Sequence, residues 1–133
     1  MRKNNRLESL KRLQHIEKAI ESVKKYTVNE NVETFCANSL IHDAVLFQFS
    51  VIGEAINHVD NEILEKYDYP WYKVRSFRNL IAHEYFNVKL SSVWQIVQSD
   101  LEGLKNVIQT VIKNEFEAIL MFTRCMVYQN SFK

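Results

Sequence analysis

The sequence predicts an all-α protein, an antiparallel helical bundle of four main helices and a short one. Only two Gly and one Pro occur among 133 residues, whereas sheet-rich folds of this size use many turn residues. Hydrophobic residues make up 47% and charged residues 25%, which is typical of a packed globular core. Apolar residues recur at three- and four-residue steps, the period of an amphipathic helix. Together these features indicate long helices joined by short connections.

The predicted helices follow the apolar pattern along the chain. They cover about residues 5–25, 32–59, 62–67, 70–85 and 93–112. The segment 44–56 is apolar on nearly all sides, so we expect it to be buried on several sides. Gly53 lies inside it. Because Gly costs a helix roughly 1 kcal/mol relative to Ala, we expect another backbone to approach closely at that position.

Residues suited to begin or end a helix stand at these boundaries. They are Asp60 or Asn61 before the short helix, Asp68 with Pro70 before the next, Asn87 after it, and Ser91 or Ser92 before the last. Past residue 113 the pattern weakens. Phe116, Ile119 and Leu120 continue a helical stripe, but no clean apolar face follows. We interpret 1–133 as one domain with a core at about 5–113 and a C-terminal extension at 114–133, which either extends the last helix or packs on a partner.

Composition restricts where the protein works and what it binds. The formal net charge is +1, from 17 basic and 16 acidic residues, so any contact with RNA requires a local basic patch. Cys36 and Cys125 match no metal-ligand spacing, which favours free thiols in a reducing compartment. No apolar run approaches the roughly 20 residues that span a bilayer. We therefore expect a cytoplasmic protein that does not bind membranes.

The segment 78–85 sets an Arg, a His and a Tyr within an apolar helical pattern. RNA can be cut without a metal if the ribose 2′-hydroxyl attacks the adjacent phosphate. An imidazole can remove the proton near neutral pH, and a guanidinium can stabilise the charge on the transition state. We assign the first task to His83 and the second to Arg78. DNA would be excluded because it lacks the hydroxyl.

Helical geometry restricts how these two residues cooperate. Five residues at about 100° each place Arg78 and His83 about 140° apart around a regular helix. Either His83 lies at a frayed helix end, or two copies of the helix meet and complete each other's sites. The second option predicts a symmetric homodimer with a cleft at its interface. Lys73, Arg75 and Lys89 flank the motif and are candidate RNA-binding residues.

The chain resembles the HepT-like toxins of the HEPN superfamily in several places between about Leu7 and Ile112. Arg78-x4-His83-x-Tyr85 looks like the family's R-x4-H-x-Y signature, and Ile52-Gly53-Glu54-Ala55 resembles its helix-two signature. Further similar stretches are Pro70-Trp71, Tyr85-Phe86-Asn87-Val88 and Val93-Trp94-Gln95-Ile96-Val97. The extension after Asn114 departs from the family's usual ending.

The resemblance implies a fold, an activity and a partner. HepT-like proteins are helical homodimers that cleave RNA without a metal or cofactor, with tRNA a target for some and mRNA another candidate. They are toxins paired with MntA-like nucleotidyltransferase antitoxins, which transfer AMP to the motif's Tyr. Carried over, Arg78 and His83 are catalytic, Tyr85 is the AMPylation acceptor, and Asn79 orients the site. Each adenylate would place a phosphate beside Arg78, where the substrate phosphate is expected.

Other interpretations of these residues remain open. The motif could serve a non-catalytic HEPN dimer that binds a nucleotide or a nucleotidyltransferase partner, or it could only seal a dimer interface. Glu54 and His58 are four residues apart, but bundle metal sites use repeated Glu-x-x-His pairs, which the chain lacks, so no metal site is expected. We instead expect Glu54 to support the site by holding Arg78 or Arg75 from across the bundle.

Overall fold

The computed structural model describes the backbone of residues 2–84 and 87–131, and the side chains of residues 5–82 and 87–130. This part of the chain forms helices and contains no strand. The helices are α1 (Arg2–Thr27), α2 (Val32–Ala37), α3 (Ser39–Asn57), α4 (Asn61–Leu64), α5 (Trp71–Glu84), α6 (Leu90–Ser99) and α7 (Leu101–Ser131). The all-α prediction is therefore confirmed.

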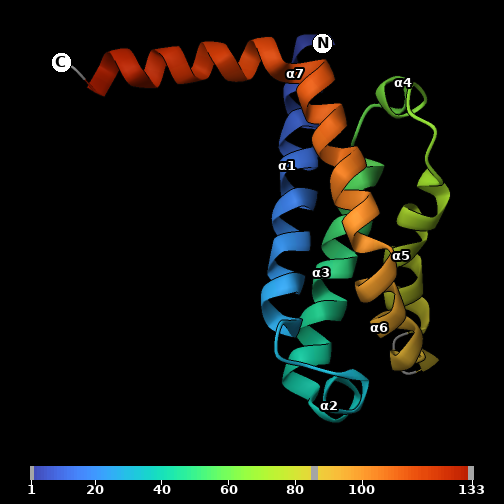
Figure 1. Ribbon diagram of the computed structural model, residues 1–133. Coiled ribbons are helices and arrows are strands. Elements are labelled where there is room, and N and C mark those ends of the chain that lie inside the picture. Colours follow the sequence, from blue (N-terminus) through green and yellow to red (C-terminus); the bar gives the residue numbers. More distant parts are fainter. Residues whose placement is uncertain (1, 85–86, 132–133) are drawn as a thin grey trace.

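The bundle is built around α3, which packs against α1 on one side and α5 on the other. Figure 1 shows α1, α3 and α5 running alternately down and up, with α6 and the first part of α7 returning upward. The α7 helix packs on α1, and α2 packs against α6. Apolar residues from all of these helices fill one core, with the largest fully buried side chains at Phe35, Phe49 and Phe116.

The prediction of one helix over 32–59 is wrong, because Asn38 divides it into α2 and α3. The backbone of Asn38 is extended (φ −102°, ψ 100°), and its side-chain oxygen accepts hydrogen bonds from the backbone N–H groups of Leu40 and Ile41. Asn competes for nearby backbone groups in this way and so favours helix caps over helix interiors. Asn31 caps α2 in a reciprocal arrangement with Thr34. Apolar periodicity did not reveal this corner because the stripe continues across it.

The other predicted helix starts have mixed outcomes. Asp60 caps α4 as predicted, its carboxylate accepting from the backbone N–H of Glu62 at 3.0 Å. The prediction of Ser91 or Ser92 as a cap is wrong: α6 begins at Leu90, and Lys89 stands at the cap position without a side-chain hydrogen bond. The last predicted helix is also divided, with Asp100 between α6 and α7.

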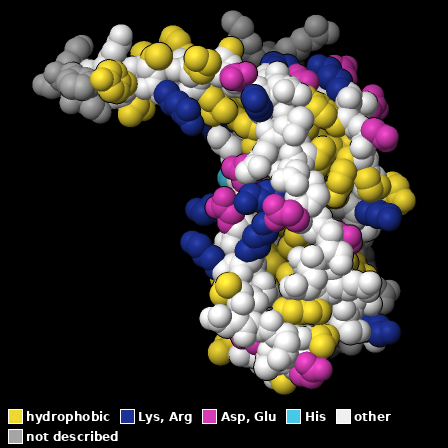
Figure 2. Space-filling model, viewed as in Figure 1, with side chains coloured by type: hydrophobic (Ala, Val, Ile, Leu, Met, Phe, Trp, Pro, Cys, Tyr) yellow, Lys and Arg dark blue, Asp and Glu magenta, His cyan; other side chains and the backbone are white. Residues whose placement is uncertain are grey.

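The C-terminal extension continues α7 as a helix. Phe116 is buried, whereas every residue from 121 to 130 is exposed. Figure 1 shows this part of α7 turning away from the bundle and projecting as an arm. Figure 2 shows hydrophobic side chains along the arm, and mixed positive and negative side chains over the visible face of the bundle. The segment therefore extends the last helix, which was the first of the two alternatives.

The α3 helix is long and apolar enough, by length and composition alone, to cross a membrane, although 39% of its residues in the relevant window are buried inside the protein. The printed sequence had suggested no such segment. The position of α3 between α1 and α5 accounts for its composition, because a central core helix meets the same criterion.

Candidate active site

The site is organised by an unusually close approach of α3 and α5. A Cβ atom added at Gly53 would lie 2.5 Å from the backbone nitrogen of Arg78 and 3.0 Å from its Cβ. Real side chains do not tolerate such distances, so a residue larger than Gly would push the helices apart. The expectation of a close backbone approach at Gly53 is confirmed. The backbone it admits is that of Arg78 itself.

Contacts with α4 and α3 also fix the position of α5. Trp71 is buried at the start of α5, and its indole N–H donates to the carbonyl of Leu64 at 3.0 Å. The ring of Phe77 stacks on that of Phe49, with centroids 5.0 Å apart and planes 17° apart. These contacts set both the rotation and the height of α5, so the position from which Arg78 projects is determined by the core.

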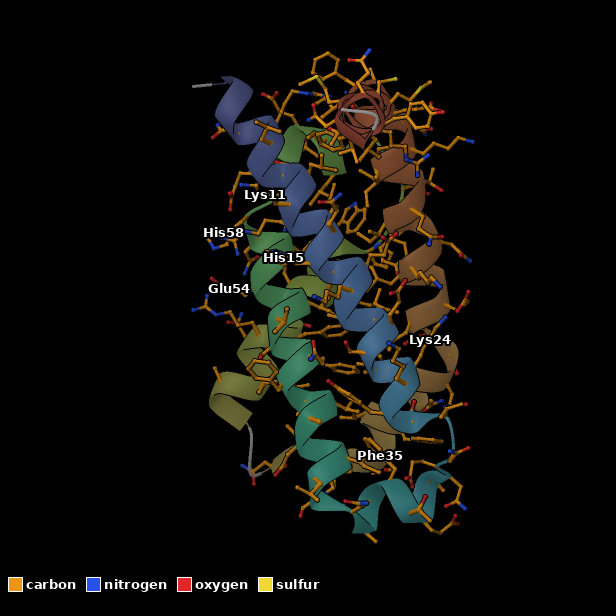
Figure 3. The ribbon with its side chains drawn as sticks, turned by 90° about the vertical axis from the view of Figure 1, so that its left-hand side faces the viewer. Lys11, His15, Lys24, Phe35, Glu54 and His58 are labelled. Atoms are coloured by element: carbon orange, nitrogen blue, oxygen red, sulfur yellow. The ribbon has the colours of Figure 1, made fainter. Side chains whose placement is uncertain are left out.

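The side chain of Arg78 forms an ion pair across the seam with the residue after Gly53. Its Nε atom lies 2.8 Å from Oε2 of Glu54, and the contact is one of charge, because Oε2 is buried and accepts no hydrogen bond from the described residues. The other carboxylate oxygen, Oε1, lies 2.9 Å from Nε2 of His58 on the next turn of α3. Figure 3 shows Glu54 and His58 projecting from the same side of α3. The structure therefore pairs Glu54 with Arg78, which was one of the two arginines considered for it.

The Glu54 carboxylate is held in its charged form. The hydrogen bond with His58 is the largest cause of its lowered pKa, and the charge of Arg78 acts in the same direction, while partial desolvation opposes them. About half of the Arg78 side chain, 55%, remains exposed. A guanidinium held at one end and open to solvent at the other can still bind a phosphate.

The remaining motif residues are placed less completely. Asn79 is exposed next to Arg78. His83 lies on α5, but its side chain is outside the described residues, and Tyr85 lies outside them altogether. Residues 78 and 83 both belong to α5, so the shared cleft between two copies stays a prediction for these two residues.

The three flanking basic residues have different surroundings. Arg75 donates to the side-chain oxygen of Asn61 at 2.6 Å. Lys89 is exposed at the start of α6. Lys73 lines a groove on another side of α5. Their role in binding RNA stays a prediction. A basic surface that included all three would have to extend around more than one side of α5.

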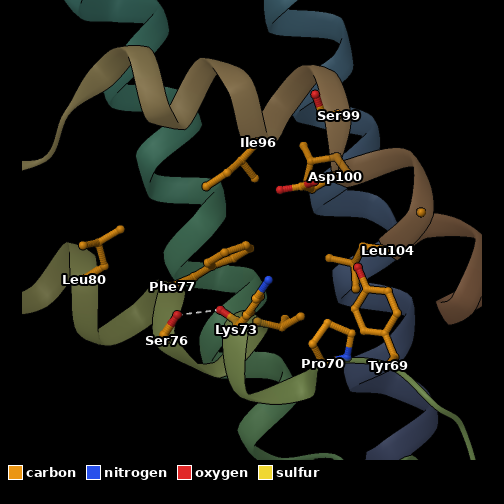
Figure 4. Close-up of a pocket in the computed structure, with 13 residues that line it drawn as sticks. Tyr69, Pro70, Lys73, Ser76, Phe77, Leu80, Ile96, Ser99, Asp100 and Leu104 are labelled. Carbon is orange, nitrogen blue, oxygen red and sulfur yellow. Dashed lines mark hydrogen bonds between the residues drawn. The ribbon is translucent and has the colours of Figure 1, made fainter.

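The groove beside Lys73 separates α5 from α6 and the start of α7 and has a volume of about 420 Å³. Figure 4 shows Phe77 and Leu80 on its α5 side, with Ile96 and Leu104 across from them. Its rim is polar. Asp100 lies there near Tyr69, whose pKa is raised by burial and secondarily by that carboxylate. The groove leaves one flank of α5 uncovered.

Within the described residues, no cluster of three or more His, Cys, Asp or Glu side chains could hold a metal ion. The contact that sequence reasoning missed is the hydrogen bond between His58 and Glu54. Its only signal was their four-residue separation, which places two side chains on the same helix face. That signal had been considered for a metal site and not for a polar contact.

Comparison with known proteins identifies a family. Residues 16–111 match the family model described as "Ribonuclease HepT-like". A protein of Methanocaldococcus jannaschii named "Gamma-glutamylcyclotransferase and putative RNase" is 32% identical over 76% of this chain, but the match covers 46% of that protein. A "Putative RNase" of the same organism is 29% identical over 74% of this chain and 92% of its own length. "Probable ribonuclease HepT" of Thermococcus cleftensis is 29% identical over 70% and 86%.

No solved structure matches the chain. The family match includes α3, α5 and the whole segment 78–85, whereas the projecting arm of α7 lies beyond it.

Proposed function

We propose that this protein, which belongs to the HepT-like ribonuclease family, is a metal-independent RNA endonuclease in which Arg78 and His83 carry out catalysis. The observation that supports this most directly is the mounting of Arg78. The α3–α5 seam holds its backbone against Gly53 and its Nε beside Glu54, while half of the side chain stays open to solvent. A cation positioned in this way suits a phosphate that gains charge during reaction.

The reaction proceeds by attack of a ribose 2′-oxygen on the adjacent phosphorus. His83 takes the proton from the 2′-hydroxyl, the new P–O2′ bond forms, and Arg78 stabilises the charge on the non-bridging oxygens. The P–O5′ bond then breaks, and the departing 5′-oxygen takes a proton from a second imidazole. The products are a 2′,3′-cyclic phosphate and a 5′-hydroxyl. Atoms and charge balance without any added reactant.

The second imidazole comes from a second copy of the chain. Arg78 and His83 diverge by about 140° on one helix, so a homodimer in which two α5 helices face each other supplies one Arg and one His from each copy to a shared cleft. The exposure of 55% of the Arg78 side chain supports this arrangement, because it leaves that side of α5 available to a facing helix. Lys73, Arg75 and Lys89 would line the approach of the RNA in the cytoplasm.

Cleavage assays on the purified protein test this assignment. Wild type, Arg78→Ala and His83→Ala are incubated with tRNA and mRNA in the presence of a chelator, and 2′,3′-cyclic phosphate ends are quantified. His15→Ala is the matched control, since His15 is an exposed imidazole on α1. We expect a loss of at least about 100-fold in both site variants, in line with the contribution of general base catalysis, and none in the control. Equal cleavage by all four proteins would contradict the catalytic assignment.

We further propose that the protein is the toxin of a toxin–antitoxin pair and that an MntA-like nucleotidyltransferase silences it by AMPylating Tyr85. The added phosphate would carry negative charge to the position that Arg78 offers to substrate. Co-expression with the nucleotidyltransferase should add one or more AMP masses to the wild type and to Tyr72→Phe, which alters an exposed Tyr on α5. The mass should not change in Tyr85→Phe, and a shift that survives this substitution would refute Tyr85 as the acceptor.

A further inference from the structure

We propose that His58 is a positioning residue for the RNA cleavage reaction, acting on Arg78 through Glu54. This inference rests on the proposed function. The supporting observation is that the two oxygens of one carboxylate have different partners on different helices. Oε1 lies 2.9 Å from His58 Nε2, and Oε2 lies 2.8 Å from Arg78 Nε.

Without His58, the geometry of the carboxylate would be poorly determined. The terminal torsion of a Glu side chain is broad and roughly two-fold, so a single contact with Arg78 would leave the carboxylate free to turn. The side chain of Glu54 is 40% exposed, and its buried oxygen Oε2 accepts no hydrogen bond, within the part of the chain that the structure describes, that would fix the carboxylate. His58 stands one turn further along the same helix, and its hydrogen bond fixes the orientation of the carboxylate relative to α3.

The orientation matters because Arg78 can pair with a carboxylate in two ways. Contact through Nε leaves the two terminal Nη nitrogens available for a phosphate. A turned carboxylate could instead form the two-pronged pairing that Arg and carboxylates favour, and would then compete with the RNA phosphate for the same nitrogens. By occupying Oε1, His58 disfavours that competing arrangement. The contact with His58 also offsets part of the negative charge of Glu54, which weakens the attraction between the carboxylate and Arg78.

The other charged side chains near Glu54 have hydrogen-bond partners of their own, so His58 is the residue that orients its carboxylate. Glu8 on α1 accepts a hydrogen bond from Arg12 at 2.7 Å. Arg12 contributes to the lowered pKa of Glu54 only after His58 and Arg78. Arg75, the other arginine near the seam, donates to Asn61. The chain from His58 through Glu54 to Arg78 is thus the direct connection between α3 and the exposed guanidinium.

Kinetics of His58 variants test the proposal. His58→Ala should lower kcat/KM for RNA cleavage about 10-fold, which corresponds to roughly 1.4 kcal/mol. His58→Gln should restore kcat/KM to within about three-fold of wild type. Its side-chain amide N–H can donate to Glu54, and one neutral hydrogen bond can replace most of the lost contribution. His15→Ala serves as the control for loss of an imidazole. Thermal unfolding of each variant shows whether the fold is retained.

A double-mutant cycle separates action through Glu54 from an independent effect. If His58 acts through Glu54, then His58→Ala should cause no further loss in a Glu54→Ala background. A loss of the same size in both backgrounds would overturn the proposal, as would a His58→Ala variant that cleaves like wild type.

A measurement without RNA distinguishes failure of this inference from failure of the proposed function. The Nε–H resonance of Arg78 in a ¹⁵N spectrum reports the contact with Glu54. We expect the signal at the same position in wild type and His58→Gln, and a shifted or exchange-broadened signal in His58→Ala. An identical signal in all three proteins would refute the positioning role, even if the protein proved to have no ribonuclease activity.

Discussion

The two sides of α5 differ sharply in their packing. On the side facing α3, the backbone of Arg78 fits against Gly53 with no room for a Cβ, and Phe77 stacks on Phe49. On the side facing α6 and α7, a groove of about 420 Å³ remains, and Leu80 at its edge is 37% exposed. One helix is therefore held rigidly along one edge and left open along another.

This difference separates positioning from recognition. A catalytic cation needs a rigid mounting, because small displacements of reacting groups are costly. A surface that receives RNA or a second copy of the chain must remain uncovered. Under the proposed function, the packed seam would meet the first requirement through Gly53 and Glu54, and the open flank of α5 would meet the second. Substitutions on the two sides should accordingly have unequal effects.

The largest effect is expected where the packed side is tightest. Gly53→Ala should reduce the free energy of unfolding by about 3 kcal/mol, at the upper end of ordinary overpacking, because the obstructing atom is backbone. Gly103→Ala is the matched control, since a Cβ there meets nothing within 4 Å, and Ala should stabilise α7 by up to about 1 kcal/mol. Urea unfolding measures both. Similar stabilities for the two variants would show that the helices separate without strain.

A second, smaller contrast compares two apolar residues that line the groove, of which only Phe77 also stacks on α3 through Phe49. Phe77→Ala should cost about 2 kcal/mol, less than a fully buried Phe because the ring is only half-buried. Leu80→Ala should cost about 0.5 kcal/mol, as expected of a surface position. The same urea titrations provide these values. If Leu80→Ala proved the more destabilising, the groove would have to be covered in solution, which would itself indicate self-association and should then depend on protein concentration.

The smallest expected change in stability comes from the charge of Glu54, which pairs with Arg78. The lowered pKa of Glu54 means that its contribution to stability is present above the pKa of an unfolded Glu, about 4.3, and is lost as the pH falls through the lower folded value. The stability difference between wild type and Glu54→Gln should therefore shrink as the pH is lowered from about 5 toward 3. Thermal unfolding at several pH values measures it.

Glu21→Gln is the control for that experiment, because Glu21 is exposed on α1 and no ion pair of its carboxylate is seen among the described side chains. Its difference from wild type should not show the same dependence on pH. If the stability difference between wild type and Glu54→Gln did not change with pH, the charge of Glu54 would make no contribution to stability.

Parts of the site could be predicted because they are local. The segment 78–85 and the four-residue step from Glu54 to His58 are visible in the printed chain, and Gly53 stands out inside an apolar helix. The corners at Asn38 and Asp100 were missed, since an apolar stripe can continue through a change of direction while a capping side chain determines the break. The choice of Arg78 over Arg75 as the partner of Glu54 was also open.

The amino-acid sequence by itself determined the helical class, the buried faces and the identity of the motif residues, because periodicity and side-chain chemistry are properties of neighbouring positions. The tertiary structure decided where α5 crosses α3, and hence that Arg78 lies against Gly53 and pairs with Glu54. That crossing depends on how the surfaces of two helices interlock. Contacts between positions 24 and 25 residues apart arise from this packing, and no local pattern encodes them.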